Sequence, residues 1–352
     1  MLCTNSNPQL FWKYVRQKCN PQDNKKKLNL CDEDGVPIPS SQLCDLFNNF
    51  IKSCHSNIQD EHTVICNSFD NNHNKACNIQ DCPNRITLAE VYDAINKVKT
   101  VNSCGIDNLP IIVYKNCADI IGKALCDLFN LILSTGSFPE DWKTAKVIPV
   151  PKKGNSTKMD NYRPISILPA ISKVFEKIIH QHLVKFLQLK EIISNSQFGF
   201  QKKLSTTNNL ITFNYFIQKT LDAGNEVHAV FVDFRKAFDS VNHTLLIHKL
   251  YCIGFHHCYI ELLQNYLSNR YQYTFCNGYS SKTLPCIAGV PQGSLLGPML
   301  FIIFINNISL KLTCNHLLFA DDLKIYSTIS TSHFIEDIES LQHNINLCQM
   351  EF

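Results

Sequence analysis

The stretch HAVFVDFRKAFDSVNH, residues 228–243, places an acid, Asp233, directly after a run of apolar, β-favouring side chains. The run predicts a buried strand. A carboxylate at the end of such a strand is less hydrated than it would be in a solvated loop, and this loss of hydration is unfavourable. A second stretch, HLLFADDLKIYS at residues 316–327, sets Asp321 and Asp322 between two apolar runs. If the two stretches are neighbours in the fold, three carboxylates converge and a bound cation is the expected compensation.

The two adjacent acids are expected to differ in role. Neighbouring side chains on a strand point to opposite faces, whereas a tight turn presents one or both acids at its tip. We expect Asp321 to share a site with Asp233 and Asp322 to be more peripheral. A solvated turn is the commoner use of an isolated Asp-Asp pair. The additional aspartate at the strand end, Asp233, favours a magnesium site instead, because carboxylates and substrate phosphates together commonly bind Mg²⁺. Two such ions suit an in-line displacement at phosphorus.

Charge is unevenly distributed along the 352 residues, whose net charge is +3. Between Lys143 and Lys203, twelve Lys and Arg stand against three acids, so this segment carries +9 and the rest of the chain −6. Stretches of like charge are usually solvated faces. A basic part joined to an acid-bearing part, however, suits a phosphate polymer and its metal ions.

The sequence contains no recognisable export or membrane signal. The first residues lack the apolar core of a signal peptide, and the apolar run MLFIIFI, residues 299–305, is far too short to span a membrane. We therefore expect a soluble intracellular protein of the cytoplasm or nucleus, with no membrane partner.

The seventeen cysteines include no C-x-x-C pair, which predicts free thiols in a reducing compartment. Zinc is a minor alternative, because one group of candidate ligands lacks the usual spacing. That group is His62, Cys66, His73, Cys77 and Cys82.

Periodicity, caps and turns predict helices separated by strands and hairpins, hence an α+β chain. Thr87 followed by Glu90 forms a capping box that opens a helix, and Asn277-Gly278 between β-rich flanks predicts a hairpin. Further helices are expected near residues 41–54, 121–136, 205–224, 241–251 and 258–269 and within 160–187 and 289–308, and an extended run at 145–154.

Three segments, in chain order, resemble the palm motifs of non-LTR (LINE-like, jockey/CR1-type) retrotransposon reverse transcriptases: FVDFRKAFDSVNH, GVPQGSLLGPMLFIIFINN and FADD. Upstream segments resemble the fingers motifs of that family: GSFPEDWKTAKVIPVPKKG, NYRPISILPAISKVFEKII and SQFGFQKKLSTTNNL. FWKYVRQKC and DEDGVPIPSSQLCDLFNNF resemble the linker that follows the endonuclease in such elements. The order of the motifs over residues 86–330 makes the resemblance specific.

The resemblance implies an α+β, right-hand polymerase fold. Residues 1–85 would form a linker-like N-terminal extension and residues 86–352 the reverse transcriptase domain, with fingers to about residue 224 and an incomplete palm from there on. The family's upstream endonuclease and its thumb are not recognisable, so the chain resembles an element's protein truncated at both ends. Asn306-Asn307 replaces the family's usual Asn-Asp after the palm helix, which puts no metal ligand in doubt.

The resemblance assigns catalysis and metal binding to Asp233, Asp321 and Asp322, and implies two Mg²⁺ ions, with Mn²⁺ as a substitute. Phe238 matches the family's steric gate, an aromatic ring that would exclude a ribose 2′-hydroxyl and so select deoxynucleotides. The alternative for this residue is an ordinary core phenylalanine. Asp239 is interpreted as a helix cap rather than a ligand, because it precedes an expected helix.

Lys153 and Arg163 match basic finger positions that would contact the incoming triphosphate. A flexible surface lysine is the alternative for Lys153, whereas the planar guanidinium of Arg163 suits bidentate phosphate binding. Gln292 and Gly293 lie in a PQG turn, which the family sets against the nucleotide and template. The alternative is a turn that only introduces the following helix, and both can hold together.

The implied activity is that of an RNA-directed DNA polymerase, in which a primer 3′-hydroxyl attacks a deoxynucleoside triphosphate and pyrophosphate leaves. The implied partners are an RNA template, a DNA primer and deoxynucleoside triphosphates. Gly199 and Phe200 match template or primer contacts, although packing alone would explain Phe200. A truncated, inactive remnant that only binds nucleic acid is the alternative for this chain. A viral RNA-dependent RNA polymerase would share the acids but would not be expected to keep Phe238.

Overall fold

The structure, a computed structural model, describes residues 28, 30, 37–55, 83–101, 103–152, 157–234 and 236–350. The helices are α2 (Ser40–His55), α3 (Leu88–Lys97), α4 (Ile111–Asn116), α5 (Ala118–Thr135), η4 (Glu140–Trp142), η5 (Met159–Asn161), α6 (Ala170–Leu189), α7 (Thr206–Asp222), α8 (His243–Ile253), α9 (His257–Leu267), α10 (Gly297–Lys311) and α11 (Phe334–Met350). The strands are β1 (Thr144–Pro151), β2 (Tyr162–Ile167), β3 (Glu226–Asp233), β4 (Arg270–Cys276), β5 (Tyr279–Ser280), β6 (Leu284–Cys286), β7 (Asn315–Phe319) and β8 (Asp322–Ile329).

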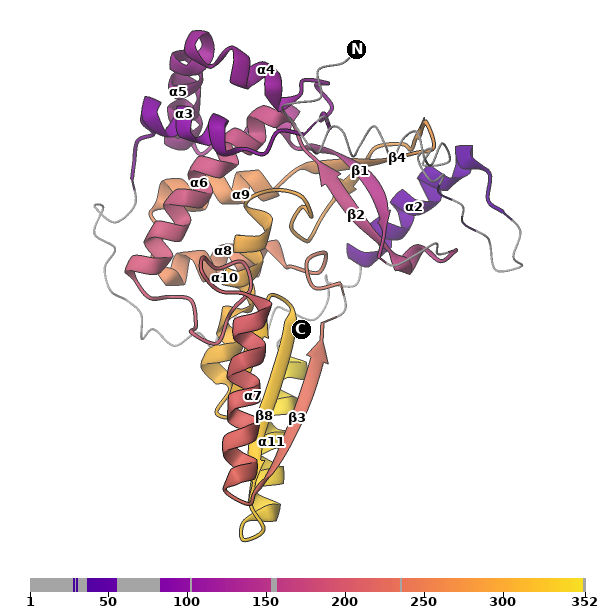
Figure 1. Cartoon of the computed structure of the whole chain (residues 1–352). Coiled ribbons are helices and arrows are strands. Elements are labelled where there is room, and N and C mark those ends of the chain that lie inside the picture. Colours follow the sequence, from indigo (N-terminus) through magenta and orange to yellow (C-terminus); the bar gives the residue numbers. More distant parts are fainter. Residues whose placement is uncertain are drawn as a thin grey trace, which may run out of the picture.

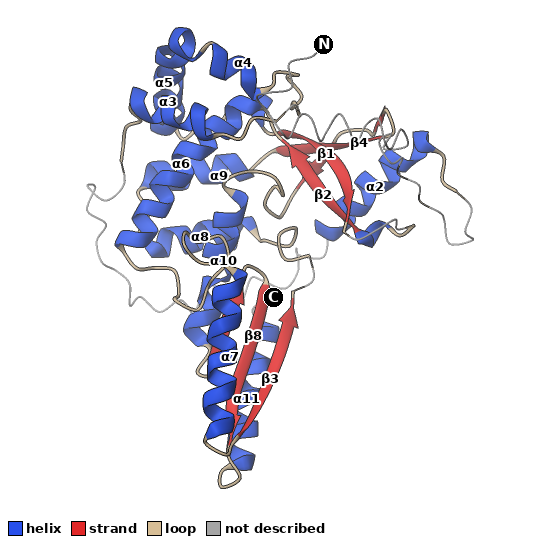
Figure 2. Cartoon of the chain, in the orientation of Figure 1, coloured by secondary structure: helices blue, strands red, loops and turns tan. Residues whose placement is uncertain are grey.

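Helices and strands are mixed along the chain and form two sheets, in agreement with the expected α+β class. The larger sheet lies beside α2 and the main group of helices (Figure 1). The smaller sheet projects away from that group, with α7 and α11 beside its strands (Figure 2).

The larger sheet has the strand order β2-β1-β4-β5, with β6 also paired to β4. β1 runs antiparallel to β2 and parallel to β4. The hairpin predicted at Asn277-Gly278 is confirmed, because these residues join β4 to β5. Their φ angles of +50° and +88° are those that a type I′ turn requires.

Helix α2 packs on the larger sheet. Leu43 and Phe47 of this helix are fully buried and share a hydrophobic cluster with Val147 of β1 and Cys276 of β4. The helix expected near residues 41–54 is therefore present and in contact with residues far along the chain. The domain boundary near residue 85 stays a prediction.

The smaller sheet has the order β3-β8-β7, with both pairs antiparallel. The strand expected at residues 229–232 is present as part of β3, but the expectation that it is buried is wrong. β3 is an edge strand, its side chains are at most half-buried, and Phe231 is 66% exposed. α7 covers part of one face, where Phe213 packs edge-on against Tyr326 of β8 at 5.0 Å between ring centroids. α11 contacts β8 as well.

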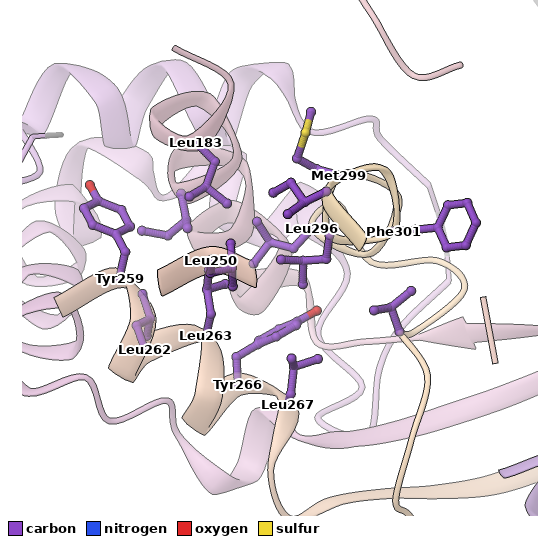
Figure 3. Close-up of a cluster of buried hydrophobic side chains, with 14 of the residues drawn as sticks. Leu183, Leu250, Tyr259, Leu262, Leu263, Tyr266, Leu267, Leu296, Met299 and Phe301 are labelled. Atoms are coloured by element: carbon purple, nitrogen blue, oxygen red, sulfur yellow. The ribbon is translucent and has the colours of Figure 1, made fainter. Parts of the chain in front are cut away.

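A large hydrophobic core connects α6, α8, α9 and α10, and extends to the hairpin of β7 and β8. Figure 3 shows part of this core, in which labelled side chains of α6, α8 and α9 gather together while the ring of Phe301 in α10 points away from them. The labelled residues are Leu183, Leu250, Tyr259, Leu262, Leu263, Tyr266, Leu267, Leu296, Met299 and Phe301. α10 is buried along most of its length, so the turn before it and the hairpin after it are attached to a rigid element.

The predicted helix ends are largely confirmed. The capping box of α3 is present, with the Thr87 N–H donating to the Glu90 carboxylate at 2.8 Å and the Glu90 N–H donating to the Thr87 hydroxyl at 3.3 Å. Gly136, in the left-handed region at φ +61°, ends α5. The helix expected from residue 241 begins two residues later, because Asn242 is its N-cap.

The cysteines within the described ranges are free thiols. The five candidate zinc ligands lie outside the described residues. Among the helices that the structure describes, none is both long and apolar enough to cross a membrane.

Candidate active site

The acids of the two opening stretches meet at one end of the smaller sheet. β3 and β8 pair with Asp233 directly opposite Asp322. In the hairpin of β7 and β8, Phe319 faces Asp322, so Ala320 and Asp321 form the two-residue turn between the strands. Directly opposed residues of an antiparallel pair project from the same face. The two stretches are therefore neighbours, and their three carboxylates share one end of the sheet.

The surroundings change the acidity of Asp321. Burial raises the pKa of its carboxyl, and the negative charges of Asp322 and Asp233 raise it further. Its own backbone N–H and the Arg163 guanidinium lower the pKa. Asp233 and Asp322 are exposed, whereas Asp321 is half-buried. The sheet end thus concentrates negative charge that a cation would offset.

The donor set suits a hard cation that takes oxygen ligands. Within the described ranges, no three His, Cys, Asp or Glu side chains are placed to hold a metal ion by themselves. Mg²⁺ does not require such a group, because it is commonly bound through one or two carboxylates together with water and substrate phosphates. Asp233 and Asp322 are exposed and Asp321 is half-buried beside them, and these carboxylates fit this mode of binding.

Phe238 lies in the turn that follows β3. Its ring stacks on Phe301 of α10, with the ring centroids 4.3 Å apart and an angle of 21° between the planes. Phe200 meets it edge-on at 6.2 Å. Phe238 remains half-buried and Phe200 is 54% exposed, so part of this aromatic group faces solvent. The steric gate stays a prediction, to which the contact with Phe301 adds a packing role.

The PQG turn packs directly on β2. Gly293 has φ +132°, and a Cβ atom there would lie 2.3 Å from the carbonyl oxygen of Ser166, so only glycine fits. The Ser166 N–H donates to the Gln292 carbonyl at 2.7 Å. Arg163 is exposed on the same strand. The structure therefore brings two of the sequence-predicted nucleotide contacts, the PQG turn and Arg163, into one neighbourhood.

Asp239 is not the helix cap that the sequence predicts. The N-cap of α8 is Asn242, whose Oδ1 accepts a hydrogen bond from the Leu245 N–H at 3.0 Å. Asp239 Oδ1 instead accepts from Gln292 Nε2 at 2.7 Å, and burial raises the pKa of this aspartate while the Gln292 amide lowers it. Asp239 therefore holds the Gln292 side chain. No local pattern indicates this contact, because the two residues are 53 positions apart.

Gly199 lies against the turn that carries Asp321. A Cβ atom at Gly199 would lie 2.3 Å from the Ala320 backbone nitrogen, so the two backbones are in direct contact. Neighbouring Phe200, with φ +55°, directs its ring toward Phe238. Template and primer contacts by Gly199 and Phe200 stay predictions. The observed partners of both residues belong to the candidate site.

The basic segment contributes fewer free charges than its sequence suggests. The side chain of Lys143 is fully buried and pairs with Glu140 at 2.6 Å, and burial lowers the pKa of Lys173. Lys153, a predicted triphosphate contact, lies outside the described residues. Among the residues of the segment that the structure describes, the exposed cations are Lys152, Lys158, Arg163, Lys185, Lys202 and Lys203.

Comparison of the sequence with known proteins finds a family match and several relatives. Residues 150–352 match the family described as reverse transcriptase (RNA-dependent DNA polymerase). The chain is 32% identical over 224 residues, 63% of its length, to the "RNA-directed DNA polymerase from mobile element jockey" of Drosophila melanogaster. It is 34% identical over 223 residues, 62% of its length, to the "Probable RNA-directed DNA polymerase from transposon BS" of the same species. Each match covers 24% of the relative, so the chain spans about a quarter of the length of these relatives.

Proposed function

The chain belongs to the reverse transcriptase family, and on that premise we propose that it carries the fingers and palm of an RNA-directed DNA polymerase of a non-LTR retrotransposon. The fingers lie in about residues 86–224 and the palm follows them. The sheet of β3, β8 and β7 is the palm sheet, and its acid-bearing end is the polymerisation site. The substrates are deoxynucleoside triphosphates and a DNA primer annealed to an RNA template.

One observation supports this proposal more than any other. The pairing of β3 with β8 places Asp233 opposite Asp322, with Asp321 in the adjoining turn. These acids lie about 90 positions apart along the sequence, and each is in a segment that resembles a palm motif. An ordinary solvated Asp-Asp turn would not be expected beside a third carboxylate at a strand end, because the like charges repel one another.

Each side chain near the acids has a distinct task in this reaction. The primer 3′-hydroxyl oxygen forms a bond to the α-phosphorus as the bond from that phosphorus to pyrophosphate breaks. Asp233 and Asp321 would hold magnesium, which when bound would lower the pKa of the primer hydroxyl and offset negative charge on the phosphate oxygens. Arg163 binds the triphosphate through its guanidinium, and the turn at Gln292 lines the nucleotide.

The proposal is tested by addition of the templated deoxynucleotide to a DNA primer annealed to RNA, with the purified chain and Mg²⁺. Addition that follows the template supports the proposal. If the chain binds the primed template and adds no nucleotide at any magnesium concentration, the alternative of an inactive nucleic-acid-binding remnant replaces it.

The six exposed cations in the described part of the segment from Lys143 to Lys203 favour sequence-independent nucleic-acid binding in either case. If about four of them contact phosphates, the logarithm of the binding constant should fall with the logarithm of salt concentration with a slope of about −3. Replacing both Lys202 and Lys203 by alanine should reduce the magnitude of that slope by about 1 to 2.

Fluorescence anisotropy of labelled single-stranded RNA across a salt series measures this slope. Lys123→Ala is the matched control, because Lys123 is exposed on α5, outside the segment, and pairs with Asp127 at 2.9 Å. Equal slopes for the double variant and the wild type would show that Lys202 and Lys203 do not contact phosphate.

A further inference from the structure

The segment before Phe200 forms a support for the hairpin of β7 and β8. The Phe198 N–H donates to the Leu318 carbonyl, and the Leu318 N–H donates to the Ser196 carbonyl, each at 2.8 Å. Gln197 and Leu318 thereby form a parallel bridge that belongs to neither sheet. A short stretch located between α6 and α7 is thus fixed to the strand that leads into the acid-bearing turn.

The side chain of Gln197 extends this support to the turn itself. It is 2% exposed, and its Oε1 accepts hydrogen bonds from the N–H groups of Gly199 at 2.8 Å and Ala320 at 3.0 Å. Its Nε2 donates to the Ala320 carbonyl at 3.4 Å. One carboxamide therefore binds both polar backbone groups of the residue that precedes Asp321.

The turn requires such support for two reasons. Ala320 has φ +59°, a left-handed conformation that is unfavourable for a residue with a side chain and that persists only where the surroundings impose it. In addition, the strand pairing brings the carboxylates of Asp321, Asp322 and Asp233 to one end of the sheet, where like charges repel one another. Without a fixed backbone, the turn could relax and separate them.

We propose that Gln197 is a positioning residue that fixes the Ala320-Asp321 turn and so sets the direction of the Asp321 carboxylate toward the metal. The proposal rests on the metal-binding role proposed above. The Gln197 carboxamide hydrogen-bonds to the backbones of Gly199 and Ala320, and it acts on Asp321 through the backbone of Ala320. The sequence alone gives no sign of this role, because 123 positions separate the two residues.

Gln197→Met tests the proposal, because methionine keeps the length of the side chain and removes both hydrogen-bonding groups. Gln272→Met is the matched control. Gln272 of β4 is also a buried glutamine, 6% exposed, and its Nε2 donates to Asn48 Oδ1 of α2 at 3.1 Å. Both variants lose a buried amide, and only the first loses contact with the turn.

Two measurements on the 352-residue chain separate positioning from general stability. Hydrogen–deuterium exchange at the Ala320 amide should become about tenfold faster or more in Gln197→Met, while the Leu318 amide stays protected. Mn²⁺ binding, followed by electron paramagnetic resonance, should weaken by about 10- to 100-fold. Gln272→Met should change neither quantity. If Gln197→Met does not fold by circular dichroism, Gln197→Asn, whose amide is one methylene short of the turn, replaces it with the same expectations.

The outcomes distinguish this inference from the proposed function. Wild-type affinity and wild-type protection of Ala320 in the Gln197 variant would overturn the positioning role and leave the metal site intact. Equal loss of affinity in both glutamine variants would also overturn it, because the effect would then be general destabilisation. Wild-type Mn²⁺ binding that Asp233→Asn and Asp321→Asn do not weaken would contradict the proposed metal site, and the positioning role with it.

Discussion

Asp321→Asn is expected to reduce nucleotide addition by about a thousandfold or more and, at the same time, to raise the thermal stability of the chain. The loss of activity follows because an amide cannot supply the negative charge that a magnesium ligand provides, and the metal contributes several kcal/mol to the transition state. The gain in stability follows because the amide relieves a half-buried charge that faces Asp322 and Asp233. A residue kept for folding would show the opposite change in stability.

The pH dependence of stability gives the sign of this effect. Burial and the neighbouring acids raise the folded-state pKa of Asp321 above its unfolded-state value of about 3.9. Between these two pKa values the folded chain binds more protons than the unfolded chain. The Asp321 carboxyl therefore contributes to the free energy of unfolding at low pH, and this contribution is lost as the pH rises through the raised pKa. Asp321→Asn should remove that loss, and its stabilising effect should therefore be larger at pH 7 than at pH 4.

Single-nucleotide addition and thermal melts at the two pH values check both parts. Asp127→Asn is the matched control, because Asp127 is an exposed acid on α5 that pairs with Lys123, away from the site. It should leave activity and the pH dependence unchanged. Activity near the wild-type level in Asp321→Asn would show that this carboxylate does not hold the metal. A melting temperature that falls at pH 7 would show that its charge does not face the other acids unfavourably.

Phe238→Ala is expected to raise the use of ribonucleotides relative to deoxynucleotides, on the order of tenfold or more. The ring stacks on Phe301, which fixes it from one side, and Phe200 meets it edge-on. A ring held in this way cannot move aside for a 2′-hydroxyl, whereas a methyl group leaves room for it. Some loss of stability is expected as well, because removal of a packed phenylalanine typically costs about 3–5 kcal/mol, and less where the ring is only half-buried.

Two further variants separate sugar selection from packing. Phe238→Tyr keeps the ring and should keep the preference for deoxynucleotides. Phe216→Ala removes a half-buried ring that packs on Tyr326 at 4.7 Å between centroids, away from the site, and should lower stability without a change in sugar preference. Parallel incorporation assays with both sugars measure the ratio. An unchanged ratio in Phe238→Ala would leave this residue with a packing role only.

Local signals predicted the parts of the fold that local interactions decide. The Thr87–Glu90 capping box and the Asn277-Gly278 hairpin were both identifiable from sequence, because the groups that form them lie within a few residues of one another. The acid-bearing ends of β3 and the β7–β8 hairpin were also predicted as neighbours, although their exact pairing was not. Its register depends on the hydrogen bonds between strands from distant parts of the chain.

The failures share one physical cause, which is contact between distant residues. Residues 229–232 were expected to be buried because apolar strands usually are, but sequence does not show that β3 lies at the edge of its sheet. Asp239 was interpreted as a cap because its true partner, Gln292, comes from another segment. The role of Gln197 could not be predicted for the same reason, because its partner, the backbone of Ala320, lies 123 positions away in the sequence.

The proposed function requires that Asp233 and its neighbours form the metal site of a template-directed polymerase. Its most direct test is single-nucleotide addition to a DNA primer on an RNA template, measured against magnesium concentration for the wild-type chain and for Asp233→Asn. The wild type is expected to show saturable, magnesium-dependent addition of the templated deoxynucleotide. The rate should fall by about a thousandfold in Asp233→Asn, which remains folded because Asp233 is exposed at a strand end. Addition at the same rate by both proteins would contradict the proposed metal site.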